Sequence, residues 1–587
     1  MSKPKLALIP SGYKSGKVYS ILPNDASGDF DFTRQSIGTR VRKDGLIEEA
    51  KTIGSITNLI LNSEDFSTNW TVFNGASIST NQALAPDGTN TADKIVSNGT
   101  NYSFTRPTSN ITVTNAKYYT ASIYVKADVE TVGYIRCDYG TLIYNRKFDL
   151  STGTLSTGFD NTANIPEAER IDELANGWYR ISITDVVNTV SFEMRIYCSD
   201  GSASSGDSLF LWGAMVSEGA LSDYIKTEGT TETKRVETFT DVPRLDWLNS
   251  NCPSLLLEPQ RSNIQTYSES STGKTTQNVT LTDNSTISPN GELTAIKVTD
   301  DSVNFRHRFW ANNVSVTSGN EYTISFYVKK DSPNRYIYIN AGILGTNGSF
   351  SLDDQSTTGS VEVFETLNND WYRIGLTGTA PTTTTSIWFL QMQLGTTDAN
   401  YIGDGSSFFV WGLQFEQGSY PTSYIKTEAS AVTRLKDECI NGGDADLFDI
   451  TEGTFFVDAN NFGTPLDNYS MITFSDGNLN FIRFLYESSR IRATVYNGAI
   501  QSDYFITGVN DNERNKVAIT FKENEFKTYL NGVLKDTDTS GVVPTGFNRL
   551  NFATQSGTAR HFEGKVYDTR VYDRVLTEAE AIELTTL

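Results

Sequence analysis

The feature that constrains the fold most is a long internal repeat. Segments from the first half of the chain return about 200 residues later in the same order. A repeat unit of this length is a whole domain rather than one turn of a solenoid. Residues 57–228 and 263–428 are therefore expected to be two copies of one fold, copy 1 and copy 2. The matched segments, with their first residues, are TASIYVKAD (Thr120) and TISFYVKKD (Thr323), NGWYRISI (Asn176) and NDWYRIGL (Asn369), and LFLWGAMVSEG (Leu209) and FFVWGLQFEQG (Phe408).

The repeat unit has the pattern of antiparallel strands. In SIYVKA of copy 1 and SFYVKK of copy 2, apolar and more polar residues alternate, which is typical of a half-buried strand. In the last strand, Phe210, Trp212, Ala214 and Val216 are expected to share one face. Short apolar runs separated by turn-forming residues extend along the chain. We therefore predict an all-β protein of tandem antiparallel β-sandwich (jelly-roll) domains with a small N-terminal stem element.

The length and composition indicate several packed domains. The chain has 587 residues, of which 38% are hydrophobic and 12% aromatic. The expected boundaries are a stem segment over 1–56, copy 1 over 57–228, a second stem segment over 229–262, copy 2 over 263–428 and a C-terminal domain over 429–587. The N-terminus lacks the continuous apolar core of a signal peptide, and no apolar run is long enough to cross a membrane. We therefore expect no membrane insertion.

The charge argues against nucleic acid as a partner. The formal net charge is −22, so most of the surface would repel phosphate backbones. Carboxylates on such a surface could hold a structural calcium ion, although no loop has the regular Asp/Asn spacing of a calcium hand. The four cysteines form no metal-binding motif and are predicted to be buried thiols. No cofactor is expected, and no metal ligands are assigned.

Two sets of motifs resemble parts of phage virion proteins. The opening NLILNSEDFSTNW (from Asn58), the central WYRI and the closing WG strand resemble the carbohydrate-binding-module jelly rolls that many of these proteins carry. ILPNDASGDFDFTRQSIGTRVRKDGLIEE (from Ile21) and DVPRLDWLNSNCPSLLLEPQRSNI (from Asp241) resemble two halves of one phage fibre or tail signature, which run together in that family. The resemblance implies that copy 1 was inserted into a stem built from residues 21–50 and 238–262. We expect the two stem segments to lie together, and residues 1–50 to be a separable anchor to the virion.

The C-terminal third differs from the two copies. NKVAITFKENEFKTYLNGVLKDTDTS (from Asn515) has two alternating strands and an Asn-Gly hairpin turn. Together with ARHFEGKVYDTRVYDRVLTEAEAIEL (from Ala559), it resembles the laminin-G-like or concanavalin-like lectin sandwich. The segment LTEAEAIEL predicts a helix capped by Thr577, with Glu580 three residues on. The resemblance implies the fold but not the ligand, since such sandwiches bind sugars, proteins, calcium or nothing.

The sequence shows no motif for catalysis. The two histidines, His307 and His561, fall in different domains, and neither has the neighbours of a nucleophilic triad. A glycosidase needs only two carboxylates, and 70 acidic residues leave that option open. The C-terminal segment lacks the Glu-x-Asp-x-x-Glu strand of concanavalin-like glycosidases. We expect no enzymatic activity, and a glycan-degrading enzyme ranks third among the functions.

Binding of sugars needs aromatic faces for stacking and planar polar groups for the hydroxyls. Each residue pattern also has a structural alternative: tyrosines can cover a sheet face, a tryptophan stacked on an arginine can close a sandwich edge, and RHRFW, without a counterpart in copy 1, can be a basic loop. The candidates are Tyr134, Arg136 and Asp138 on the predicted solvent face of a strand in copy 1, Tyr336, Tyr338 and Asn340 on its twin in copy 2, Trp178 and Trp371 of the WYRI segments, and Arg306 and Trp310 of RHRFW.

These observations together predict a phage virion appendage, a head or tail fibre or a decoration protein, that binds host-surface polysaccharide. It would be assembled in the host cytoplasm, be located in the virion and contact other virion proteins. The alternative is a purely architectural virion protein. A homo-oligomer, with a trimer favoured, is expected because a stem of about fifty residues is too small to bury Leu255, Leu256 and Leu257 by itself.

Overall fold

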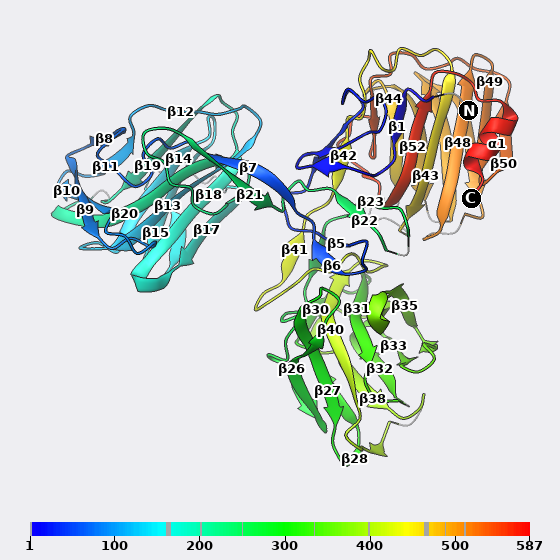
Figure 1. The fold of residues 1–587 in the computed structure, drawn as a ribbon, viewed down its shortest axis with the longest axis horizontal. Coiled ribbons are helices and arrows are strands. Elements are labelled where there is room, and N and C mark those ends of the chain that lie inside the picture. Colours follow the sequence, from blue (N-terminus) through cyan, green and yellow to red (C-terminus); the bar gives the residue numbers. More distant parts are fainter. Residues whose placement is uncertain are drawn as a thin grey trace. The chain divides into compact units, whose positions relative to one another are not determined.

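The computed structural model describes residues 3–159, 166–199, 202–248, 250–333, 335–396, 399–462, 469–487, 489–509 and 512–587. Nearly every regular element in these ranges is a β-strand, and their one α-helix is α1 (Glu578–Thr585). No helix in these ranges is long and apolar enough to cross a bilayer. The chain forms two compact units, residues 1–52 with 239–587 and residues 53–238 (Figure 1). The sheets are antiparallel, so the predicted all-β class is confirmed.

Copy 1 is a sandwich of two sheets, sheet I and sheet II. Sheet I has the order β17 (Ala168–Glu173), β18 (Trp178–Val186), β13 (Tyr118–Ala127), β20 (Ser205–Glu218), β10 (Ala92–Asn98) and β9 (Ala76–Ala83). Sheet II has the order β16 (Thr154–Thr157), β15 (Ile143–Asp149), β14 (Val132–Asp138), β19 (Ser191–Tyr197), β11 (Phe104–Pro107) and β8 (Trp70–Phe73), and β12 (Ile111–Thr112) also pairs with β19.

Copy 2 repeats the six-strand order of both sheets, which confirms the predicted match in strand order. Its sheet I has the order β35 (Val361–Thr366), β36 (Trp371–Thr379), β31 (Glu321–Lys330), β40 (Ser407–Gln417), β27 (Leu293–Asp300) and β26 (Val279–Ile287). Its sheet II has the order β34 (Thr357–Gly359), β33 (Thr346–Ser351), β32 (Tyr336–Ala341), β38 (Phe389–Gln393), β29 (His307–Trp310) and β25 (Thr275–Gln277).

A β-bulge follows the tryptophan in the last strand of each copy. The register of β20 against β13 shifts by one residue at Gly213, where φ is +61°, and Gly412 has the same role in copy 2. The extra residue swaps the faces of the strand. Ala214 and Val216 lie in the core, whereas Trp212 packs on the opposite face of sheet I. The prediction that these residues share one face is therefore wrong.

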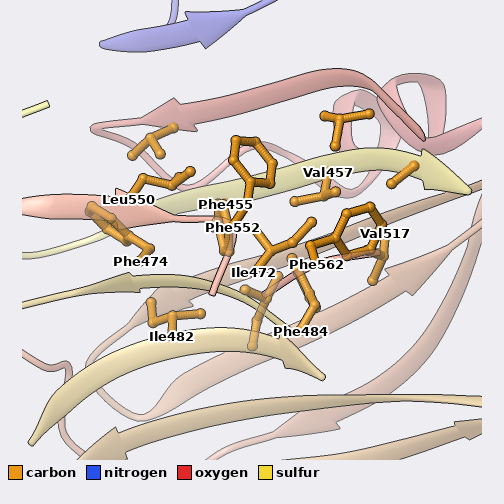
Figure 2. Packing of buried hydrophobic residues seen from close by; sticks show 14 of the residues in the cluster. Phe455, Val457, Ile472, Phe474, Ile482, Phe484, Val517, Leu550, Phe552 and Phe562 are labelled. Atoms are coloured by element: carbon orange, nitrogen blue, oxygen red, sulfur yellow. The ribbon is translucent and has the colours of Figure 1, made fainter. Parts of the chain in front are cut away.

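The C-terminal sandwich has two sheets that pack through a core of phenylalanines and aliphatic residues (Figure 2). The larger sheet has the order β22 (Arg244–Asp246), β23 (Ser254–Leu257), β52 (Gly564–Tyr572), β43 (Gly453–Asn461), β48 (Arg514–Lys522), β49 (Glu525–Leu530) and β50 (Val533–Asp538), and β1 (Leu6–Leu8) also pairs with β52. The smaller sheet has the order β47 (Ile500–Thr507), β46 (Arg490–Asn497), β45 (Asn480–Glu487), β44 (Ser470–Ser475) and β51 (Arg549–Asn551).

Two local predictions for this sandwich are confirmed. Asn531 and Gly532 both have positive φ and join β49 to β50 in a tight hairpin. Thr577 caps α1, and its hydroxyl accepts the backbone N–H of Glu580 while the Glu580 carboxylate accepts the backbone N–H of Thr577.

The two stem segments lie together, as predicted. The Asp241 carboxylate accepts the backbone N–H of Arg34, and the Asp246 carboxylate accepts the N–H of Val41. The stem is not a separate element, however. Leu6, Leu8, Phe30, Phe32 and Leu245 lie in the core of the C-terminal sandwich, and β4 (Phe30–Thr33) pairs with β42 (Glu438–Ile440). The expectation that residues 1–50 form a separable anchor is therefore corrected, because their deletion would remove part of that core.

The three leucines of the stem are covered by the chain itself. β23 pairs with β52, and Leu255, Leu256 and Leu257 are each less than 5% exposed. Partner subunits are not needed to bury them. The exposed apolar surface on which the expectation of a homo-oligomer rested does not exist.

Five buried charged groups hold together the compact unit that contains the stem. Arg34 donates to Asp437 at 2.8 Å, and Asp437 also pairs with Arg244. Arg244 pairs in turn with Glu258, which Arg434 contacts at 2.8 Å. All five side chains are at most 3% exposed. They come from the first stem segment, the second stem segment and the connection after copy 2, so one network joins three distant parts of the sequence.

Replacement of Arg244 should destabilise the unit that contains the stem. Arg244→Ala leaves Asp437 and Glu258 with one guanidinium fewer in a buried site, which typically costs about 3–5 kcal/mol. We expect faster hydrogen exchange in β23 and β52, with exchange in β13 of copy 1 unchanged. Arg42→Ala is the control, because its pair with Asp44 is about half exposed and contributes less than about 1 kcal/mol. Equal exchange in wild type and Arg244→Ala would contradict the role of the network.

The network should also make this unit sensitive to acid. Burial alone would raise the pKa of Glu258, but Arg434 and Arg244 more than offset that effect and lower the pKa. A lowered pKa in the folded state contributes stability above the unfolded value of about 4.3, and that stability is lost as the pH falls through the folded value. Thermal unfolding of Glu258→Gln should therefore differ most from wild type at pH 7, and the difference should shrink below about pH 4. A difference that stays constant down to pH 2 would refute this assignment.

Candidate functional site

The outer face of sheet II in copy 2 carries three of the predicted residues. Along β32, Ile337 and Ile339 are fully buried in the core, whereas Tyr336, Tyr338 and Asn340 alternate with them on the opposite face and are half-buried. The alternation arises because successive side chains of a strand point to opposite faces. The predicted orientation of this stripe is confirmed.

The register of the sheet places more aromatic and polar groups beside this stripe. Asn340 pairs with Phe389 of β38, which pairs with Trp310 of β29. In the adjacent row, Tyr338 pairs with Gln391, which pairs with Arg308. Because paired residues of neighbouring strands share a face, two continuous rows of aromatic and polar side chains cross the sheet. The sequence candidates Tyr338, Asn340 and Trp310 are thus brought together.

Arg308 lies on β29, next to the edge strand β25, and was not identified from the sequence. Its guanidinium carbon is 4.4 Å from the centroid of the Trp310 ring and 5.0 Å from that of Phe389. Its Nε donates to Oε1 of Gln277 at 2.8 Å. Burial lowers the pKa of Arg308 from its ordinary value, and the like charge of Arg306 lowers it further. The two rings therefore hold a cation whose charged neighbour is another cation.

The spacing of RHRFW contains a signal for this residue. Arg306, Arg308 and Trp310 are two positions apart, so in a strand they fall on one face, and His307 and Phe309 fall on the other. His307 and Phe309 are buried, Arg308 and Trp310 are half-buried, and Arg306 is exposed just before β29. An interpretation of the segment as a strand would have found Arg308.

A shallow groove continues the face beyond Trp310. It is lined by the Trp310 ring, Thr275, Asn312, Asn313 and other residues of the adjoining loops. A flat ring beside the exposed amide of Asn313 matches what sugar recognition needs, because the ring can stack on C–H groups and the amide can bond hydroxyls, whereas the Asn312 amide nitrogen already donates to Thr266 at 2.6 Å.

Copy 1 has a different surface at the same place. Ile135 and Cys137 lie in its core, as predicted, and Arg136 and Asp138 are half-buried on the outer face of β14. Tyr134 is only 5% exposed, because the Phe159 ring lies 5.1 Å from its own ring in an edge-to-face contact. An aromatic cluster that includes Phe104 and Tyr197 closes this part of the face.

The arginine of copy 2 has a counterpart in copy 1, which corrects the expectation that RHRFW has none. Thr105 of β11 and His307 of β29 occupy equivalent positions in the two copies. Each pairs with a residue of the next strand, and that residue pairs in turn with the matching isoleucine of β14 or β32. The next residues are Arg106 and Arg308. Arg106 is paired with Glu193 at 2.7 Å.

The two tryptophans of the WYRI segments lie on sheet I and apart from this face. Trp178 is 1% exposed, and its Nε1 donates to the backbone oxygen of Leu84 at 3.1 Å. Trp371 is 2% exposed and packs with Val41 and Ile47, which belong to the paired strands β5 (Thr39–Val41) and β6 (Ile47–Glu49) of the stem. Both rings are covered by their own unit, so they are not available to a ligand in this structure. The structural alternative holds for their burial, but Arg180 and Arg373 lie over the rings of Tyr124 and Tyr327 rather than over the tryptophans.

The histidines are not part of the face. Both ring nitrogens of His307 lie within 3.1 Å of backbone oxygens, those of Asn278 and Tyr401. The pKa of His561 is lowered by burial and by the positive charge of Lys436. Of the four cysteines predicted to be buried, Cys252 is exposed. Among the described ranges, no group of three or more His, Cys, Asp or Glu side chains could hold a metal ion.

A second hollow, in the stem-containing unit, is lined by aromatic and polar residues and by charged groups that are already paired. The Lys565 ammonium contacts Asp246 at 2.6 Å, and Arg373 contacts Glu365 at 2.8 Å. The Glu365 carboxylate also accepts the hydroxyl of Tyr327. These internal ion pairs neutralise the named charges of the lining, and we take the outer face of copy 2 as the candidate site because its rings and polar groups lie in continuous rows across one sheet.

The family model of the concanavalin A-like lectin/glucanases superfamily matches the sequence of residues 454–581, which are the greater part of the C-terminal sandwich. No curated protein matches the chain in sequence. The chain therefore has a lectin-like sandwich at its C-terminal end, as the resemblance implied.

Three solved structures are similar to parts of this chain. The CBM22-1–CBM22-2 tandem domain of Paenibacillus barcinonensis Xyn10C is 12% identical with a TM-score of 0.30, over 63% of this chain and 98% of its own. The CBM40 domain of Ruminococcus gnavus IT-sialidase is 17% identical with a TM-score of 0.22, over 25% and 89%. Domains LG4-5 of the mouse laminin alpha1 chain are 10% identical with a TM-score of 0.18, over 45% and 88%. No TM-score reaches 0.5, so none of these structures indicates a ligand.

Proposed function

We propose that this chain is a glycan-binding protein and that the outer face of sheet II in copy 2 is its binding site. The observation that carries the proposal is the cluster of Tyr338, Phe389, Trp310 and Arg308 on neighbouring strands, open to solvent and continued by a groove with an exposed amide. Flat rings with adjacent planar donors are the groups that polysaccharide recognition uses. The lectin-like C-terminal sandwich is consistent with the same class of ligand.

We further propose that the chain is a phage virion appendage that binds host-surface polysaccharide and contacts other virion proteins. The support is the resemblance of residues 21–50 and 238–262 to a phage fibre or tail signature. These segments supply Arg34, Arg244 and Glu258 to the buried network, and they supply apolar residues to the C-terminal core.

We propose that this site binds a glycan and does not catalyse its hydrolysis. Glycoside hydrolysis commonly uses two carboxylates on either side of the scissile bond. In the described part of copy 2, the charged neighbour that acts on Arg308 of the candidate face is Arg306, and both are cations. Aromatic, amide and guanidinium groups can orient a sugar, but they do not supply the acid and base of that reaction.

Removal of the rings should weaken glycan binding without unfolding the protein. We expect Trp310→Ala combined with Tyr338→Ala to weaken binding to a positive polysaccharide on a glycan array about ten-fold or more, which corresponds to ~1.4 kcal/mol. Both residues are half-buried on an outer face, so the thermal midpoint should change little. Phe505→Ala is the matched control, because Phe505 is an exposed ring of the C-terminal sandwich.

Two results would contradict the proposal. If the wild-type protein bound none of a broad panel of bacterial surface polysaccharides, the result would favour the architectural alternative. Loss of binding with Phe505→Ala but not with the double variant would place the site in the C-terminal sandwich instead.

A further inference from the structure

We propose that copy 2 selects acidic polysaccharides, and that Arg308 receives the carboxylate of an acidic sugar residue. This inference rests on the proposed function and specifies the class of ligand for the same face. It commits to a carboxylate because the guanidinium group is planar and offers paired N–H donors that fit the two oxygens of that group.

The first argument is the missing counter-charge. In this acidic chain, the buried arginines of the stem network contact carboxylates directly, as does Arg373, which contacts Glu365. In the described part of the chain, the contacts of Arg308 are Gln277, Trp310 and Phe389, and none of these is acidic. A partly desolvated cation without an anion is unfavourable, and a bound carboxylate would remove that penalty.

The second argument is the comparison between the copies. In copy 1, Arg106 stands at the position of Arg308 and is paired with Glu193. Glu193 pairs across the sheet with Asp138, and Phe389 pairs with Asn340. Because Asp138 and Asn340 occupy matching positions in the two copies, Glu193 and Phe389 are equivalent positions as well. Copy 1 therefore supplies its own carboxylate where copy 2 has a phenyl ring. The exchange removes the internal anion and keeps the cation.

The third argument is geometric. The bond from Nε to Gln277 fixes one edge of the guanidinium group, and the Trp310 and Phe389 rings restrict its plane. The two Nη nitrogens carry the remaining donors, which are the pair that a carboxylate can accept side by side. A sugar ring stacked on Trp310 would bring its carboxylate within reach of the two Nη nitrogens. One sugar residue of the polysaccharide could then contact both the Trp310 ring and the Arg308 guanidinium group.

The net charge of the chain makes the inference selective. A formal charge of −22 repels polyanions in general, so a preference for an acidic polymer would not come from the overall field. It would need a local cation such as Arg308, assisted by the exposed Arg306.

The test compares alginate, hyaluronan and polysialic acid with the same three polymers after reduction of their carboxyl groups to alcohols. We expect full-length protein to bind at least one acidic polymer about ten-fold or more tightly than its reduced form. Arg308→Gln should remove this preference while it keeps the weak binding to the reduced polymer. Phe389→Glu, which rebuilds the ion pair of copy 1, should have the same effect. Arg106→Gln in copy 1 is the matched control and should leave the preference unchanged.

Each other outcome overturns a defined part of the account. Equal binding of acidic and reduced polymers would refute the selectivity and leave the proposed function standing. A preference that survives Arg308→Gln with unchanged thermal stability, or that Arg106→Gln removes equally, would refute the assignment to Arg308. If the protein bound none of the six polymers and no neutral polysaccharide, the result would refute both the selectivity and the proposed function.

Discussion

The fold of the stem-containing unit depends on a buried network of five charges. Arg34, Arg244, Glu258, Arg434 and Asp437 are nearly inaccessible to water, so each needs the others to offset its loss of hydration. Arg34 and Asp437 are 403 positions apart in sequence. The network therefore forms only when the stem, the end of copy 2 and the start of the C-terminal sandwich have come together. It explains how residues 53–238 can interrupt this unit without dividing it.

Local patterns were sufficient to predict much of the fold. The repeat gave the matching strand order of the copies, and the Asn531–Gly532 turn and the Thr577 cap are specified by neighbouring residues. Features that depend on distant partners were missed. The bulge at Gly213 becomes visible only when β20 is paired with β13. The burial of Leu255–Leu257 follows from pairing with β52, about 300 residues away, so the stem could not be recognised as part of the C-terminal core.

The same distinction applies to the site. Alternation along one strand correctly placed Tyr338 and Asn340 on an outer face, but it could not show that Phe159 covers Tyr134 in copy 1. Arg308 gains its meaning only from the register, which puts Phe389 beside it where copy 1 has a glutamate. The two copies thus share a scaffold and differ in the surface that they present. Duplication of a stable sandwich allows this, because outer-face residues can change without a cost in core packing.

The central claim is that the outer face of sheet II in copy 2 holds a polysaccharide. A crystal structure of the full chain with an acidic oligosaccharide, such as one from alginate or hyaluronan, tests it most directly. The account predicts a sugar ring stacked on Trp310, with its carboxylate bonded to the Nη nitrogens of Arg308. An oligosaccharide bound instead to the C-terminal sandwich or to copy 1, with the face of copy 2 vacant, would contradict it.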